Sequence, residues 1–220
     1  AVQAATGVLL WLENNGGPNP TFIRRDVAGG LAYPVALDSG DLDNDGDPDL
    51  LVALRDGNRI LGYRNNGGAA PSFSQFQPAS DGNGMVDVVI GDVDRDGKLD
   101  FVAASENDDR IAWYRNLGGL AFSPSVLRKG SGLDPQKDYA KSVALADFNQ
   151  DGRLDVAYGS EDGGVIGWYA GPGPNGGGWT HRQIIAGLDH IKMVTAADLD
   201  RDGDLDLLSA SAFDNKILWY

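Results

Sequence analysis

The sequence predicts an all-β fold, a β-propeller with about four blades of four antiparallel strands. A nine-residue aspartate loop, Asp-x-Asp/Asn-x-Asp-Gly-x-x-Asp, starts at Asp41, Asp92, Asp147 and Asp198, at intervals of 51, 55 and 51 residues. Short runs rich in Val, Ile and aromatic residues lie between Gly-, Asn- and Asp-rich turns, which is typical of strands. A repeat of this length with four short strands has the size of a propeller blade.

Each repeat contains four predicted strands, which we name inner, second, third and outer in chain order. The inner strand precedes the aspartate loop, as in 85–90, and the second strand follows the loop, as in 50–53. The outer strand opens on Phe or Trp after a Gly/Asn turn. The third strand carries an aromatic pair and recurs at 60–63, 111–114, 166–169 and 217–220, with a fifth copy at 9–12 that has no loop before it.

We expect a single domain over 1–220, with repeats at approximately 29–79, 80–130, 131–185 and 186–220 and N-terminal strands in 7–28. The distance from the outer-strand aromatic to the next loop is 19 residues in three copies but 25 between Phe122 and Asp147. The extra residues fall in 129–138. That segment is either a tolerated loop insertion or an excursion that contacts a ligand.

The strand count leaves ring closure open. The outer strand around 21–26 can complete the last blade, which gives a closed four-bladed ring with one strand displaced. The other solutions are a piece of a larger propeller and an assembly that exchanges strands between chains. Because an open arc exposes strand edges, we favour a larger propeller or a multichain assembly.

The aspartate loop has the donor pattern of a calcium site. Carboxylates at positions 1, 3, 5 and 9 and the backbone carbonyl of position 7 supply oxygen ligands, and Gly at position 6 permits the sharp turn. Four crowded carboxylates without a cation would repel one another, which argues against an acidic turn that binds nothing. The predicted ligands are Asp41, Asp43, Asp45, Asp47 and Asp49; Asp92, Asp94, Asp96, Lys98 and Asp100; Asp147, Asn149, Asp151, Arg153 and Asp155; and Asp198, Asp200, Asp202, Asp204 and Asp206, the fourth of each set through its carbonyl.

We therefore expect about four structural Ca²⁺ ions, one in each blade. Magnesium is less favoured because it requires stricter octahedral geometry and fewer protein ligands. The third loop is the weakest candidate, since Asn149 removes one negative charge. An EF-hand is excluded because position 12, where it needs a glutamate, is Val52, Ala103, Tyr158 or Ser209, each within a predicted strand.

The composition limits the partners. The formal net charge is −14, which argues against nucleic acid and anionic membrane surfaces. Only three of the 32 acidic residues are glutamates, so much of the acidity is loop aspartate. No apolar run is long enough for membrane insertion, and there is no cysteine for a disulfide framework. The chain starts at Ala1 without a signal-type stretch, and we expect any targeting segment to be absent from it.

The loops and runs such as Ile111–Asn116 resemble the FG-GAP/VCBS-type repeats of calcium-binding β-propellers, the group that includes the integrin α-subunit head. The resemblance covers essentially all of the chain. It implies an extracellular or cell-surface location. The Phe-Gly and Gly-Ala-Pro motifs of integrin repeats are absent, so integrin-type ligand recognition is not implied.

Three functions are compatible with these observations. The first is an extracellular, calcium-stabilised binding or adhesion module for a protein or glycan ligand at the cell surface or matrix, acting as a homo-oligomer or as part of a longer chain. Its ligand contacts are expected on the face opposite the aspartate loops. The candidates there are Tyr33, Tyr139 and His190, which share one aligned position with Gly84, and Arg55, Asp56, Asn107, Asp108, Asp109, Glu161, Asp162, Phe213 and Asp214.

The second function is a carbohydrate-binding propeller, which needs exposed aromatic side chains. Trp11, Trp113, Trp168 and Trp219 recur at one strand position and are interpreted first as core between blades. The third is a polysaccharide lyase-type enzyme. The two histidines, His181 and His190, lie in no recognisable catalytic motif, so we expect no enzyme.

Overall fold

The fold is entirely β in a computed structural model that describes residues 1–68, 70–128, 139–172 and 178–220. In these residues the strands form five antiparallel sheets, three with four strands and two with three. No helix in the described ranges is long and apolar enough to cross a membrane. The all-β prediction is thus confirmed, and the expected insertion at 129–138 lies outside the described residues.

Each four-stranded sheet follows the inner, second, third and outer order. The first consists of β4 (Pro34–Gly40), β5 (Asp49–Leu54), β6 (Arg59–Asn65) and β7 (Phe73–Ala79). The second consists of β8 (Met85–Gly91), β9 (Asp100–Ser105), β10 (Arg110–Asn116) and β11 (Phe122–Arg128). The third consists of β12 (Ala140–Ala146), β13 (Asp155–Ser160), β14 (Ile166–Ala170) and β15 (Thr180–Ile185).

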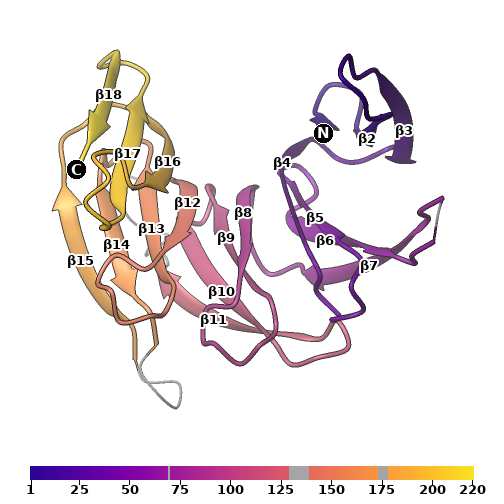
Figure 1. Cartoon of the computed structure of the whole chain (residues 1–220). Helices are drawn as coiled ribbons and strands as arrows, with labels where there is room; N and C mark the ends of the chain where they lie inside the picture. The colour runs from indigo at the N-terminus through magenta and orange to yellow at the C-terminus, as the bar shows by residue number, and fades with distance from the viewer. Residues whose placement is uncertain (69, 129–138, 173–177) are drawn as a thin grey trace.

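The two end sheets have three strands each. At the N-terminus these are β1 (Val2–Gln3), β2 (Val8–Asn14) and β3 (Phe22–Ala28); at the C-terminus they are β16 (Ile191–Ala197), β17 (Asp206–Ser211) and β18 (Lys216–Trp219). The sequence analysis did not predict β1. Its Val2 pairs with Leu9 of β2, so β1 takes the place of a second strand in the N-terminal sheet. β3 pairs with β2 and does not complete the C-terminal sheet. The closed ring through β3 is therefore absent from the described structure, whose sheets form an open arc with the termini at its two ends (Figure 1).

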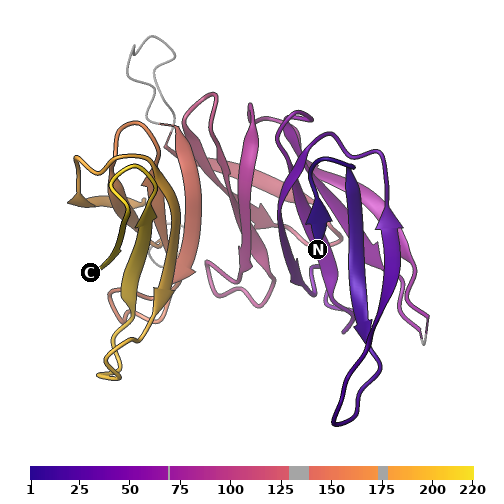
Figure 2. The same cartoon turned by 90° about the horizontal axis from the view of Figure 1, so that it is seen from above.

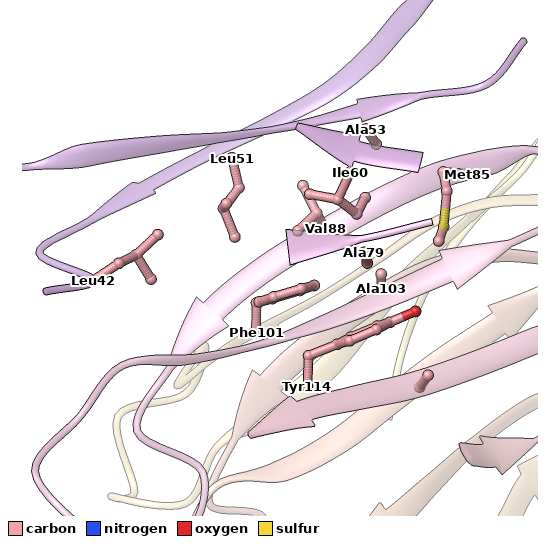
Figure 3. Close-up of a cluster of buried hydrophobic side chains, with 11 residues drawn as sticks. Leu42, Leu51, Ala53, Ile60, Ala79, Met85, Val88, Phe101, Ala103 and Tyr114 are labelled. Atoms are coloured by element: carbon pink, nitrogen blue, oxygen red, sulfur yellow. The ribbon is translucent and has the colours of Figure 1, made fainter. Parts of the chain in front are cut away.

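Neighbouring sheets stand face to face, as the view from above shows (Figure 2). The interface between the first two complete sheets buries Leu51 and Ile60 against Phe101 and Tyr114 (Figure 3). The rings of Phe101 and Tyr114 stack with centroids 4.4 Å apart. These interfaces supply the apolar burial that no single sheet could achieve alone.

The aromatic pair on the third strand makes the two faces of each sheet different. The tyrosine faces the preceding sheet, as Tyr114 does, whereas the tryptophan faces the following one, where Trp113 packs edge-on against Trp179 at 5.6 Å. Trp113 is 6% exposed, which confirms its interpretation as core. Trp219 is 54% exposed, because no described sheet lies beyond β18.

The first complete sheet departs from this pattern at Gly62, which stands in the tryptophan position. Phe76 of β7 pairs with Gly62, and its ring fills the space: a Cβ on Gly62 would lie 2.1 Å from Phe76 Cζ. A phenylalanine on the neighbouring strand therefore replaces the missing indole.

The inner strands line the centre of the arc and are joined by side chains. Asp38 Oδ2 accepts a hydrogen bond from Ile90 N at 2.7 Å, and Asp87 Oδ2 accepts one from Val143 N at 3.0 Å. Burial raises the pKa of Asp87. The four inner strands β4, β8, β12 and β16 border a groove of about 600 Å³.

Candidate metal centres

The aspartate loops all connect an inner strand to a second strand, so they gather at one end of the sheets. The turn requires a left-handed backbone at the position 6 glycine, with φ values of 93° at Gly46 and 83° at Gly97. Position 4 is also left-handed, as at Asn44 with φ 62°. Asn44 Nδ2 donates to Gly97 O at 3.3 Å, so the first loop contacts the second.

The first carboxylate of each loop organises the turn around itself. Asp41 accepts hydrogen bonds from Asp45 N at 3.0 Å and from Gly46 N at 2.9 Å. The equivalent bonds recur at Asp92 and Asp147. In the fourth loop Gly203 N still donates to Asp198 at 3.2 Å, but Asp198 Oδ1 accepts from Arg201 N at 2.7 Å. The loops are thus folded by their own hydrogen bonds before any cation is considered.

Three of the four loops bring carboxylate oxygens together. The atoms of Asp41, Asp43 and Asp45 lie within 4.8 Å of one another, as do those of Asp92, Asp94 and Asp96 and those of Asp198, Asp200 and Asp206. In the third loop the described residues form no such group of three, since position 3 is Asn149. Convergent oxygen donors are what a hard divalent cation prefers, so the residues present fit the expected ion.

Position 9 lies deeper than the other ligand positions. Asp49, Asp100 and Asp155 are all 0% exposed. Asp100 accepts hydrogen bonds from Val93 N at 3.2 Å, Trp113 Nε1 at 3.0 Å and Asn116 N at 2.8 Å. Burial raises the pKa of Asp100 to about 6, and that of Asp155 likewise to about 6. This carboxylate therefore ties the loop to the second and third strands, and at Asp100 three of its roughly four lone pairs are already engaged.

Two arginines that the sequence reading missed reach these carboxylates. Arg64 Nε lies 2.5 Å from Asp43 Oδ2, and Arg115 Nε lies 2.6 Å from Asp94 Oδ2. Both arginines directly follow the third-strand tyrosine, which is the signal that could have identified them. Each guanidinium offsets part of the charge of its loop, so a bound cation would share the outer oxygens with it.

At the opposite end, the aligned position of Tyr33, Gly84, Tyr139 and His190 has a backbone role. All four residues have left-handed φ values, 53°, 70°, 48° and 58° respectively. Their carbonyls accept hydrogen bonds from the N–H groups of Arg55, Glu106, Glu161 and Ala212. The same turn therefore fixes this position in the three complete sheets and in the C-terminal sheet.

A chain of ion pairs crosses the sheets at this end. Arg55 pairs with Glu106, Glu106 with Lys141 at 2.6 Å, Lys141 with Glu161 at 3.0 Å, and Glu161 with Lys192. Glu106 is 3% exposed. Arg55 and Glu161 were sequence candidates. The other members were missed, although Glu106 and Glu161 are aligned and belong to the three glutamates of the chain.

Most remaining candidates contact side chains of their own turn or of a nearby strand or connection. Asp108 and Asp214 accept hydrogen bonds from the hydroxyls of Ser105 at 2.6 Å and Ser211 at 3.1 Å. Asp109 forms an ion pair with Arg128 at 2.9 Å, and Asn107 forms a hydrogen bond with Asn83 at 3.2 Å. The His190 ring lies 3.9 Å from the Phe213 ring between centroids, and its Nε2 lies 3.5 Å from Asp162 Oδ1. Asp56 is exposed.

The two histidines lie in different sheets. His181 Nε2 lies 2.8 Å from Tyr158 Oη, and burial lowers the pKa of His181. His190 Nδ1 lies 2.6 Å from Asp189 Oδ1. Within the described ranges, the two histidines thus have different side-chain partners.

Comparisons with known proteins agree with the repeat. A model of the FG-GAP-like repeat matches residues 41–103, 92–158 and 147–209. Cartilage acidic protein 1 is 30% identical over 76 residues in Mus musculus and Homo sapiens and 29% identical in Xenopus tropicalis. These alignments cover 34% of this chain and 11% of each relative, so the chain matches a small part of the relatives' length.

Two solved structures share the fold. A chain of the crystal structure of BBS1N in complex with ARL6DN, soaked with lead, has a TM-score of 0.58 and 16% identity over 87% of this chain and 55% of that chain. An Agrocybe aegerita lectin that recognises non-reducing terminal N-acetylglucosamine has a TM-score of 0.52 and 18% identity over 79% of this chain and 46% of that chain. At sequence identities of 16% and 18%, these structural similarities show a shared propeller-type fold alone.

Proposed function

The chain belongs to the FG-GAP-like repeat family, and on that premise we propose that it is a binding module held in shape by calcium. The observation that carries the proposal is the convergence of three carboxylates in the first, second and fourth loops. When bound, calcium would neutralise carboxylates that otherwise repel one another. The chain's own part is to hold the loops folded through their first aspartates and to anchor them through the buried ninth ones.

The proposal places the module outside the cell. Calcium loops of modest affinity fill at millimolar calcium, which is an extracellular condition. The relatives named cartilage acidic protein support the same location. The partner is then a protein or a glycan of the cell surface or matrix. It would contact the end of the sheets away from the aspartate loops, where side chains vary among repeats that are otherwise alike.

A carbohydrate ligand is the second candidate. Phe213 is 64% exposed and Tyr33 is 43% exposed, both at the end away from the aspartate loops. Exposed rings next to polar groups, such as Phe213 beside His190, are suited to the faces of sugars. Glycan-array binding that disappears in Phe213→Ala would support this candidate, and binding unaffected by that change would remove it.

We propose a non-enzymatic role. Catalysis would need an acid or base positioned beside a charge-stabilising group, and the two histidines have different partners: His181 contacts Tyr158, and His190 contacts Asp189 and Asp162. A lyase assay on acidic polysaccharides tests this expectation directly, and turnover above that of heat-inactivated protein would refute it.

The calcium part of the proposal is tested by metal content and melting. Calcium-saturated protein should contain bound ions and melt at a higher temperature than protein in chelator, because a ligand that binds only the folded state stabilises it. Asp94→Ala should lose one ion, whereas Asp26→Ala, an exposed acid paired with Arg24 outside the loops, should lose none. Equal melting temperatures with and without chelator, or an unchanged ion count in Asp94→Ala, would contradict the proposal.

A further inference from the structure

One carboxylate joins the first two complete sheets by satisfying two buried groups. Asp81, in the connection from β7 to β8, accepts a hydrogen bond from Tyr114 Oη at 2.6 Å and one from Arg110 at 2.5 Å. Arg110 also donates to the carbonyl of Asp81 at 2.6 Å. Arg110 is 5% exposed and Tyr114 is 1% exposed. In Figure 3 the phenol oxygen of Tyr114 points toward the Met85 end of the interface, away from Leu42.

The preceding sheet carries the same arginine and tyrosine without the acid. Arg59 and Tyr63 on β6 align with Arg110 and Tyr114, and Gly30 aligns with Asp81 in connections of equal length. Tyr63 is 3% exposed, and its hydroxyl has no hydrogen-bond partner among the described residues. The buried Nε of Arg59 is also unpaired there.

The Tyr63 hydroxyl and the Arg59 Nε both belong to side chains of β6. Arg59 and Tyr63 lie four residues apart on β6, so their side chains leave the same face of the sheet. Burial raises the pKa of Tyr63, and the charge of Arg59 acts against that rise. The one hydrogen bond that Arg59 makes through its side chain within the described ranges is long, 3.5 Å to Gln77 Oε1. An unsatisfied buried donor is costly, so both groups favour an acceptor.

Space for that acceptor exists beside Gly30. A Cβ added at Gly30, or at Gly29 next to it, would meet no heavy atom within 4 Å. Both glycines are exposed, so the position opens to the surface. Gly30 therefore supplies no carboxylate to Arg59 and Tyr63, whereas Asp81 supplies one to Arg110 and Tyr114 in the following sheet.

We propose that Arg59 and Tyr63 form a binding site for a single carboxylate on a short stem, which enters beside Gly30. The ligand chemistry is that of an aspartate side chain, because Asp81 shows this donor pair accepting that group within the same molecule. The carboxylate comes from a small free acid or from an aspartate of a peptide. The inference rests on the part of the proposed function that places ligand contacts at the end away from the aspartate loops.

The direct test is titration of calcium-saturated protein with sodium acetate at constant ionic strength, with chloride as the reference anion. The Arg59 Nε–Hε resonance should shift saturably. Tyr63→Phe should weaken binding about ten- to a hundredfold, the value of one hydrogen bond to a charged group, and Arg59→Met should abolish it. Arg24→Met, which removes an exposed arginine paired with Asp26, is the matched control and should bind as wild type.

Two titrants distinguish the sources of the carboxylate. Binding of N-acetylaspartate amide tighter than that of acetate indicates a peptide aspartate, and the reverse order indicates a small free acid. No response of wild type to either titrant overturns the proposal, and it would mean that water satisfies these donors. If melting of the same sample depends on calcium while acetate has no effect, only this inference fails; if neither effect is seen, the proposed function fails as well.

The following sheet offers an internal control. Asp81→Ala turns Arg110 and Tyr114 into an unpaired donor pair like Arg59 and Tyr63. The variant should melt at a lower temperature and be restored by acetate more than by chloride. Rescue of Asp81→Ala without any response of wild type would overturn the assignment to Arg59 and Tyr63. The wild-type titration decides the question even if Asp81→Ala does not fold.

Discussion

Replacing Asp100 by alanine should destabilise the protein even when no calcium is present. The carboxylate is 0% exposed and accepts three hydrogen bonds, from Val93 N, Trp113 Nε1 and Asn116 N. A buried donor left without a partner costs about 1–3 kcal/mol, so three donors cost roughly 3–9 kcal/mol. Removal of the aspartate also brings relief: burial raises the pKa of Asp100 from 3.8 to about 6. That shift corresponds to about 3 kcal/mol against the ionised form at neutral pH.

The net loss should therefore lie between roughly 0 and 6 kcal/mol, and its midpoint of about 3 kcal/mol lowers Tm by roughly 6–12 °C in a chain of this size. The assay is thermal unfolding in EDTA, followed by far-UV circular dichroism. Asp94→Ala is the matched control, because Asp94 pairs with the exposed side chain of Arg115 and makes none of these buried bonds. In EDTA the control should melt within a few degrees of wild type, since an ion pair with a solvent-exposed partner contributes about 0–1 kcal/mol. The reasoning fails if Asp100→Ala melts like wild type in EDTA, or if both variants lose the same amount.

Three further outcomes are expected. Gly62→Trp should lower stability by about 1–3 kcal/mol through its clash with Phe76, and adding Phe76→Ser should recover most of the loss; a double variant no better than the single one would contradict the replacement of indole by phenyl. Glu106→Ala should lower the free energy of unfolding by about 2 kcal/mol in chemical denaturation, because Arg55 and Lys141 lose a carboxylate partner that is only 3% exposed. Glu13→Ala, which removes an exposed pair with Arg25, should change the free energy of unfolding little. In EDTA, wild type should gain in Tm relative to Asp155→Asn as the pH falls from about 7 to about 5. The pKa of Asp155 in the folded protein, about 6, exceeds its unfolded value, so protonation of this carboxyl stabilises the folded state, and that contribution is lost as the pH rises. A Tm difference that does not change with pH would refute this.

Much of the fold could be predicted because the aspartate loop marks the same point in each repeat. Once Asp41 and its counterparts are aligned, strand order and the tyrosine and tryptophan positions follow from spacing. The two-residue strand β1 was missed because no loop precedes it and Val2–Gln3 is too short to show alternation. Ring closure also required the structure, since spacing does not say which sheet β3 joins.

The sites were predictable in part, for a physical reason. Loop ligands are local, so Asp92, Asp94 and Asp96 could be identified from one stretch of sequence. Contacts between repeats are not local: Asp81 meets Tyr114 across 33 residues, and Arg55 meets Glu106 across 51. Such pairs depend on how one sheet lies on the next, which periodicity alone does not determine.

The opposed third-strand aromatics make three of the four described interfaces between sheets head-to-tail. In these, one side offers the tryptophan position, filled by Phe76 in one case, and the other offers the tyrosine. Interfaces of this kind let units be added without inventing a new contact surface. Gene duplication of one repeat could thus lengthen the array while every junction kept its old chemistry, and a repeat whose ligand-facing turns had diverged would still fit between any two neighbours.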